Sequence, residues 1–357
     1  MINIMNGKKV KQKIKICVLH GAINNAGDFL IYERGKKLIE SFFNNNFDLT
    51  YILRCKTING DFDGLIILGG PLITRKLHSQ SQNIAEYIEK RNRNIPVFCI
   101  GLGISGEKFN NYEEYFLDQE SLLFWKRVYE TTKLFSVRDE MTYNVLKNYG
   151  IEAKLTGCPA LFDLENLKKN NIVVNNKGIN KIAVTIPNLL DFPIPSIRYF
   201  LLTLYFLFLL KLEFSKIELG LFFQHGYTSI LNKIIKSLAN MMNVKTYNIS
   251  GKSLSSTELR KYDLHIGTRL HSHIYFLSLG KPSFLLSVDM RTEAFVDTFK
   301  TPNEKYTVLG IRKLIMVLKE RIRENNFKEF EEIFHRIKRS YEVMKSFLKE
   351  IAEFYNI

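Results

Sequence analysis

The sequence predicts an α/β protein with two lobes, each a parallel sheet covered by helices, and a helical C-terminal tail. Three observations lead to this fold class. The chain has 357 residues, which is longer than one hydrophobic core usually supports. Short β-branched runs alternate with helical stretches, as in a parallel sheet wrapped by helices. A polar segment at residues 165–180 separates two such series. The expected divisions are residues 1–170, 181–305 and 306–357.

The apolar runs of the first series predict strands at residues 14–19, 64–68, 95–100, 134–137 and 153–156, with helices at 29–43, 82–91 and 139–149. The second series predicts strands at residues 181–186, 217–223, 263–267 and 283–286. From residue 310 onward, apolar residues recur every three or four positions with Lys and Glu between them. This spacing predicts amphipathic helices that pack on the lobes.

Composition limits the class of protein. The chain is 46% hydrophobic and 24% charged, which is typical of a globular fold. Its formal net charge of +15 favours anionic partners, but no nucleic-acid-binding motif is present, so nucleic acid is not expected. The cysteines are Cys17, Cys55, Cys99 and Cys158. Their wide spacing indicates neither a zinc site nor a disulfide framework, and a cytoplasmic location is expected.

The most apolar run, residues 199–210, is too short to span a bilayer and predicts a buried helix. A helix lying on a membrane surface is the alternative, because Arg198, Lys211 and Lys216 flank the run. The run at residues 14–19 is too short for the core of a signal peptide, so secretion is not expected.

Three glycine-containing segments follow predicted strands, where α/β folds approach ligand phosphates. They are residues 21–28, in which Asp28 is expected to cap the next helix, residues 69–71 and residues 101–106. The third matches G-x-G-x-x-G, but it follows an internal strand, so it is a weak sign of a dinucleotide site. Plain tight turns are the alternative for each. The candidate residues are Asn24, Asn25, Asp28, Gly69, Gly70, Gly101 and Gly103.

Two further segments carry chemistry. Arg138 and Asp139 stand where a strand passes into a helix, so Arg138 is a candidate for binding carboxylate or phosphate. A helix-capping Asp139 beside a solvated arginine is the alternative. Residues 265–273 hold three histidines and Arg269. Within them His271 is the candidate proton donor, whereas His265 and His273 are expected to be structural, and no metal site is expected.

Taken in order, these segments resemble the polysaccharide pyruvyl transferase family. The resemblance covers roughly residues 14–290 and rests on residues 21–28, 69–70, 101–106, 136–139 with 156–160, and 269–271 through 280–282. It implies Rossmann-like lobes arranged as in GT-B glycosyltransferases, and transfer of a pyruvyl group from phosphoenolpyruvate to sugar hydroxyls as a ketal, without a cofactor. Cys158 departs from the family pattern, in which many relatives have an aspartate before the proline.

The resemblance also implies roles for the candidate residues. His271 and Asp28 are expected to be catalytic. Donor binding is expected from Arg138, Arg269, His271, Gly69, Gly70, Gly101 and Gly103. The acceptor side is expected to contain Asn24, Asn25 and Asp139. The expected acceptor is a sugar or a lipid-linked oligosaccharide. Peripheral contact with the inner face of the membrane is a further expectation that the sequence leaves open. The alternatives are a nucleotide-sugar glycosyltransferase of the GT-B type and a non-catalytic protein of polysaccharide assembly.

Overall fold

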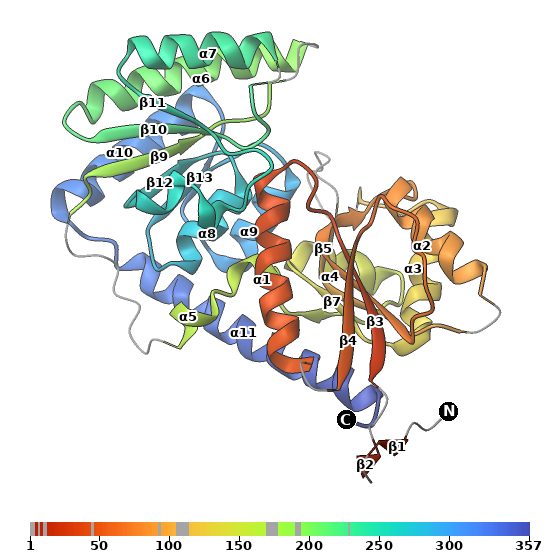
Figure 1. The fold of residues 1–357 in the computed structure, drawn as a ribbon. Coiled ribbons are helices and arrows are strands. Elements are labelled where there is room, and N and C mark those ends of the chain that lie inside the picture. The colour runs from red at the N-terminus through yellow and green to blue at the C-terminus, as the bar shows by residue number, and fades with distance from the viewer. Residues whose placement is uncertain are drawn as a thin grey trace.

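The computed structural model describes residues 4–5, 8–9, 13–43, 46–91, 94–104, 114–168, 178–189, 194–227 and 229–357. It contains two six-stranded sheets in which every pairing is parallel, each flanked by helices (Figure 1). The first lobe has strand order β4-β3-β5-β6-β7-β8 and the second lobe has order β11-β10-β9-β12-β13-β14. The second order is that of a doubly wound Rossmann sheet. The predicted two-lobed α/β fold is confirmed.

A short hairpin of β1 (Ile4–Met5) and β2 (Lys8–Lys9) precedes the first lobe. The strands of the first lobe are β3 (Ile14–His20), β4 (Phe47–Leu53), β5 (Gly64–Ile73), β6 (Val97–Ile104), β7 (Phe135–Val137) and β8 (Lys154–Leu155). Its helices are α1 (Ala26–Phe43), α2 (Ser79–Glu89), α3 (Gln119–Thr132), α4 (Glu140–Asn148), η2 (Pro159–Leu161) and α5 (Leu164–Leu167).

The strands of the second lobe are β9 (Lys181–Thr185), β10 (Glu218–Phe223), β11 (Lys245–Asn248), β12 (Leu264–Gly267), β13 (Ser283–Ser287) and β14 (Asn303–Lys305). Its helices are α6 (Ile194–Glu213), α7 (Ile230–Met241), η3 (Leu254–Ser256), η4 (Glu258–Lys261), α8 (Leu270–Ser278), α9 (Met290–Phe299) and α10 (Val308–Glu324). Helices α8 and α9 lie toward the first lobe, and α6 and α7 lie on the far side of the sheet (Figure 1). The last helix is α11 (Glu329–Phe354).

The strands of the two six-stranded sheets that sequence reasoning missed are β4, β11 and β14, and all three lie at the edges of their sheets. The hairpin strands β1 and β2 were not predicted either. An edge strand has a neighbour on one side only and is less buried, so it needs less apolar sequence. Strand β14 reads Asn-Glu-Lys, and β4 has a single buried residue at its start. These sequences lack the apolar runs by which the inner strands were recognised.

The prediction that residues 69–71 and 101–106 form turns directly after their strands is wrong. Strand β5 continues through Gly69 and Gly70 to Ile73, with an irregularity in its pairing to β6. Strand β6 likewise continues through Gly101 and Gly103 to Ile104. Residues 105–106 of the third glycine segment and residues 169–177 of the predicted linker lie outside the described residues. The glycine segments therefore extend the sheet toward the second lobe before the chain turns.

Helix α1 begins at Ala26, three residues earlier than predicted, so Asp28 lies in its first turn and does not cap it. The side chain of Asn25 accepts a hydrogen bond from the Gly27 backbone N–H at 3.1 Å. Asn25 therefore fills the capping position that the sequence analysis gave to Asp28.

The apolar run at residues 199–210 lies in α6, which is only partly buried. Phe206, Leu207 and Leu210 are fully buried, whereas Leu201 and Phe208 are 60% and 57% exposed. Among the described residues, no helix has both the length and the apolar content needed to cross a bilayer.

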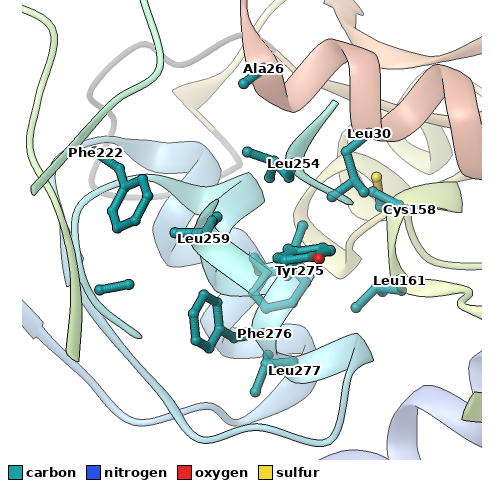
Figure 2. Close-up of a cluster of buried hydrophobic side chains, with 14 of the residues drawn as sticks. Ala26, Leu30, Cys158, Leu161, Phe222, Leu254, Leu259, Tyr275, Phe276 and Leu277 are labelled. Carbon is teal, nitrogen blue, oxygen red and sulfur yellow. The ribbon is translucent and has the colours of Figure 1, made fainter. Parts of the chain in front are cut away.

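The two lobes share a continuous hydrophobic core. Ala26 and Leu30 of α1 and Leu161 of η2 pack near Tyr275 and Leu277 of α8, which belongs to the other lobe (Figure 2). Because apolar burial stabilises a fold roughly in proportion to the area removed from water, this core holds α1 and α8 together across the lobe boundary.

Arg34 of α1 is the polar centre of this interface and is 5% exposed. Its guanidinium donates to the backbone oxygen of Ala160 at 2.5 Å, to the Ser278 hydroxyl at 2.5 Å and to the Asp163 carboxylate at 3.1 Å. Ser278 is in α8 of the second lobe, whereas Ala160 and Asp163 follow the first sheet. One buried cation thus joins three segments that are distant in sequence.

Helix α11 returns from the second lobe to the first. It contacts α8 and α9 on one side and α1 and β8 on the other. At its end, Phe354 and Tyr355 pack edge-on against Phe98 of β6 and Phe47 of β4, respectively. The C-terminal helix therefore completes the core of the first sheet.

We expect Arg34→Met to lower the free energy of unfolding by about 3 kcal/mol, because it leaves the buried Ala160 carbonyl and the half-buried Asp163 carboxylate without their donor. Urea denaturation followed by circular dichroism measures the change. Lys37→Met, which removes an exposed pair with Glu33 on the same helix, is the matched control and is expected to change stability by less than about 1 kcal/mol. Equal effects of the two substitutions would contradict the role of Arg34.

Candidate functional site

A cavity of about 500 Å³ lies between the carboxyl ends of the two sheets. The first lobe contributes Gly21, Asn25, Asp28, Arg54, His78 and Arg138, among others. The second lobe contributes Gln224, His225, Arg269, His271, Asp289 and Arg291, among others. This is the crevice in which open α/β sheets bind their ligands, because loops and helix N-termini converge there.

Four arginines line this cavity, and each follows a different parallel strand. Arg54 comes after β4, Arg138 after β7, Arg269 after β12 and Arg291 shortly after β13. The carboxylates in the lining are Asp28 and Asp289. The arginines outnumber the carboxylates two to one, so the cavity favours a ligand with more than one negative charge.

Arg138 is 4% exposed, and hydrogen bonds to neighbouring residues fix its guanidinium. Its Nε donates to the Asp139 carboxylate at 3.0 Å and a terminal nitrogen donates to the Ile104 carbonyl at 3.3 Å. Asp139 caps α4 by accepting the Thr142 backbone N–H at 2.8 Å. At Gly103 a Cβ would lie 2.1 Å from Arg138 Nε, so only glycine leaves room for this side chain. Asp139 therefore positions Arg138, and the acceptor-side role expected for it stays a prediction.

Arg54 is buried beside Gly69 and Gly70 of β5. It donates to the Gly69 carbonyl at 2.6 Å, and its Nε is buried without a partner among the described residues. Burial lowers the pKa of Arg54 to about 10, with the Asp28 carboxylate opposing that shift. The guanidinium is therefore charged at neutral pH.

The other two arginines belong to the second lobe. Arg269 Nε donates to the Ile186 carbonyl at 2.8 Å, which leaves its terminal nitrogens directed at the cavity. Burial lowers the pKa of Arg269 to about 10, and the nearby Arg291 adds to the effect. Arg291 donates twice to the Asp289 carboxylate, at 2.6 and 3.1 Å. Asp289 in turn caps α9 with its other oxygen.

His271, in the first turn of α8, approaches α1 from the opposite lobe. A Cβ at Gly27 would lie 2.4 Å from His271 Nδ1, so the histidine occupies the space that glycine leaves. Its Nε2 is buried without a partner among the described residues. Burial, Arg138 and Arg291 lower its pKa to about 3, so the imidazole is neutral at pH 7 in the free protein.

Asp28 faces the cavity from the first turn of α1. Burial raises the pKa of this carboxyl, whereas Arg54 and a hydrogen bond from Asn25 act in the opposite direction. Its side chain is therefore a stronger base than an exposed aspartate. The backbone oxygen of the neighbouring Asn24 accepts from Gly251 N–H of the second lobe at 2.7 Å, which fixes this end of α1 against that lobe.

The structure thus brings together five of the predicted site residues. Asn25, Asp28, Arg138, Arg269 and His271 line one cavity. The predicted residues outside its lining are Asn24, Asp139, Gly69, Gly70, Gly101 and Gly103. The glycines lie behind the cavity, where Gly70 packs against Arg54 and Gly101 against Pro159. Their predicted contact with the donor stays a prediction.

Sequence reasoning missed Arg54, His225 and Arg291. Arg54 follows β4, an edge strand that the sequence analysis did not recognise, and recognising that strand would have marked the residue. Arg291 and His225 follow the predicted strands at residues 283–286 and 217–223, so position alone was a usable signal for them. Burial and the cations Arg269 and Arg291 lower the pKa of His225 to about 4, so it is neutral beside them.

His265 and His273 are structural, as predicted. Both are fully buried, and both bond to the Ser283 hydroxyl, at 2.8 and 2.7 Å. Within the part of the chain that the structure describes, no group of three His, Cys, Asp or Glu side chains is placed to hold a metal ion.

Cys158 is a packing residue in this structure. It is 1% exposed and belongs to the core that joins the lobes (Figure 2). Burial raises the pKa of its thiol to about 11, so the thiol is protonated at neutral pH and unreactive. Cys158, which stands where the family pattern has an aspartate, therefore makes an apolar contact at the lobe boundary.

The fold and site define a two-lobed, Rossmann-like protein with an anion-binding cavity between its lobes. The family model "Polysaccharide pyruvyl transferase" matches residues 25–248. The match spans more than half of the chain, and the protein belongs to this family.

Solved structures of GT-B type share the fold. The chain is similar to S. aureus MnaA in a structure with UDP, with 11% identity over 96% of this chain and 97% of the other and a TM-score of 0.56. It is similar to UDP-GlcNAc 2-epimerase from Neisseria meningitidis bound to UDP-GlcNAc, with 16% identity over 95% and 100% of the chains and a TM-score of 0.53. At these identities the likeness concerns the fold. No curated protein matches the sequence.

Thiol chemistry tests the burial of the cysteines. Cys55 is exposed, whereas Cys17, Cys99 and Cys158 are buried, and burial raises the pKa of all three buried thiols. We expect a disulfide reagent to label Cys55 rapidly in the native protein and the other three only after denaturation. Cys55→Ser should abolish the rapid phase. Rapid labelling of Cys158, seen as a fast phase that persists in Cys55→Ser and disappears in Cys158→Ser, would contradict its place in the core.

Proposed function

We propose that this protein transfers the pyruvyl group of phosphoenolpyruvate to two hydroxyls of a sugar in a polysaccharide precursor, forming a cyclic ketal. One observation carries the proposal. In a member of the polysaccharide pyruvyl transferase family, four arginines, Asp28 and a histidine whose Nε2 has no partner among the described residues converge in a single interlobe cavity.

The arginines match the charges of this donor. Phosphoenolpyruvate has a carboxylate and a phosphate on one carbon, so it needs cations on two sides, and guanidinium groups bind both anions through paired hydrogen bonds. Arg138 reaches the cavity from the first lobe and Arg269 from the second. The donor would therefore be held between the lobes, and the arginines would also stabilise charge that builds on the departing phosphate.

The reaction balances without a further reagent. A proton adds to the methylene carbon of phosphoenolpyruvate, and one sugar hydroxyl attacks the neighbouring cationic carbon. Phosphate then leaves with its bridging oxygen, and a second hydroxyl attacks the same carbon. Of the two hydroxyl protons, one replaces the proton spent on the new methyl group and the other leaves with phosphate. The products are the ketal and inorganic phosphate.

His271 and Asp28 are the proposed proton carriers. Burial, with repulsion by Arg138 and Arg291, keeps His271 neutral in the free protein. The negative donor would offset that repulsion and stabilise the charged ring, so we expect donor binding to protonate His271 and make it the acid for the methylene carbon. Asp28 would accept a hydroxyl proton, since burial raises its pKa and makes it a stronger base than an ordinary exposed aspartate.

Transfer from a nucleotide sugar is the second candidate. It is favoured by the neighbours of similar fold that are described with UDP or UDP-GlcNAc, because the same arginines could bind a diphosphate.

The first prediction concerns the donor. We expect phosphoenolpyruvate to raise the melting temperature in a thermal-shift titration more than phosphate or UDP-sugars do. Arg269→Ala should abolish this shift, because it removes a cation that faces the cavity, whereas Arg127→Ala, an exposed arginine on α3, should preserve it. His271→Ala should keep the shift and lower phosphate release with a sugar acceptor by about 100-fold or more. A shift with UDP-sugars alone would overturn the proposal in favour of glycosyl transfer.

The second prediction concerns pH. The pKa of His271 is about 3 in the free protein, and a bound anion raises it, so binding takes up a proton and the affinity falls as pH rises through the bound-state pKa. Calorimetry in buffers of different ionisation enthalpy should show that the wild type takes up more protons than His271→Gln, by up to about one per donor. Because both proteins bind the same donor, the difference between them excludes any protons that the donor itself takes up or releases. Equal uptake by both proteins would remove His271 from the acid role.

A further inference from the structure

Three helices of the second lobe form one outer layer. Helix α6 contacts α7 on one side and α10 on the other, and the layer covers the side of the sheet away from the first lobe (Figure 1). The inward residues of α6, such as Phe206 and Leu210, are fully buried. The layer is therefore fixed to the sheet by its inward side, and its other side faces outward.

Large apolar side chains cover the outward surface of this layer. They are Ile197, Leu201, Phe208 and Leu212 on α6, Ile230, Ile234 and Met241 on α7, and Val308, Leu309 and Met316 on α10, each between 41% and 78% exposed. We call this set the outer apolar face. Single exposed apolar residues are ordinary, but ten on three adjoining helices are typical of an interaction surface.

The same helices are basic. Residues 194–213, 230–241 and 308–324 contain nine Lys and Arg but three Asp and Glu. Two of these three acids are already paired, Glu213 with Lys319 and Glu324 with Arg323. Lys233 and Lys313 are exposed beside the apolar residues. A partner that covers this layer must therefore have both apolar groups and negative charge.

We propose that the outer apolar face docks on the surface of an anionic lipid bilayer, with α6, α7 and α10 lying parallel to the membrane. The apolar side chains would enter the boundary between headgroups and acyl chains, and the lysines and arginines would bind lipid phosphates. A second copy of the chain is a poorer occupant. A two-fold interface would place the same basic helices against each other, which like-charge repulsion opposes.

The proposed docking face adjoins the candidate site. A second cavity of about 300 Å³ lies at the N-terminal ends of α6 and α10, lined by Arg198, Tyr199 and Thr307. It shares Val288 and Asp289 with the interlobe cavity. Docking would thus bring this second cavity, which borders the candidate site, near the lipid headgroups. The docking itself does not depend on which reaction the site performs.

Vesicle co-sedimentation tests the proposal. We expect the protein to bind vesicles of phosphatidylcholine mixed with phosphatidylglycerol, to bind phosphatidylcholine alone at least about tenfold more weakly, and to be released by salt. Leu201→Gln combined with Phe208→Gln should lower binding about tenfold, and Lys233→Glu combined with Lys313→Glu should do the same.

Matched controls come from α3 of the first lobe. Leu123 is 59% exposed, like Leu201 and Phe208, and Lys126 is exposed, so Leu123→Gln and Lys126→Glu should leave vesicle binding unchanged. An unchanged melting temperature would show that each variant folds. Three results would overturn the proposal: no binding to anionic vesicles at low salt, equal loss in the control variants, or a dimer in solution that the α6 variant converts to monomers while vesicle binding is absent.

Discussion

The contact of α1 with α8 across the lobe boundary is the constraint on which the site depends. Arg34 bonds to both sides of this boundary from within a continuous hydrophobic core. A buried cation is tolerated only when its donors are satisfied, so the three segments around it have one compatible arrangement. The first turn of α1 carries Asp28 and the first turn of α8 carries His271. Packing at the boundary thus sets the spacing of the two proposed proton carriers.

The electrostatics of the cavity follow from the same geometry. Parallel strands end at one edge of each sheet, and the two edges face each other, so arginines that follow four separate strands reach a common space. Burial lowers the pKa of His271 and of His225, and these cations lower both further. An anionic ligand would reverse that balance. The charge state of the site would then be set by its occupant, which couples donor binding to proton uptake.

The sequence predicted the inner strands and the broad order of the fold because buried parallel strands are apolar throughout. It failed at the edge strands β4, β11 and β14, of which β11 and β14 are mostly polar and β4 alternates apolar with polar residues over most of its length. Because β4 was not recognised, Arg54 was not identified. Arg138, Arg269 and His271 were found because strand ends could be located from local patterns. The supporting contacts could not be predicted. That Gly103 makes room for Arg138, and that Gly27 faces His271 in the other lobe, depends on distances between segments that no local pattern contains.

The course of α11 has a consequence for how the chain is made. Tyr355 donates a hydrogen bond to the Asp63 carbonyl at 3.3 Å, and Phe354 and Tyr355 cover Phe98 at the far end of the first sheet. The first lobe precedes the second in the chain, yet part of its core is supplied by residues 354 and 355, which are synthesised after both lobes. On the ribosome, Phe98 and its neighbours would stay open to water until residues 354 and 355 have emerged. Completion of the first lobe therefore has to wait for synthesis of the second lobe and of α11.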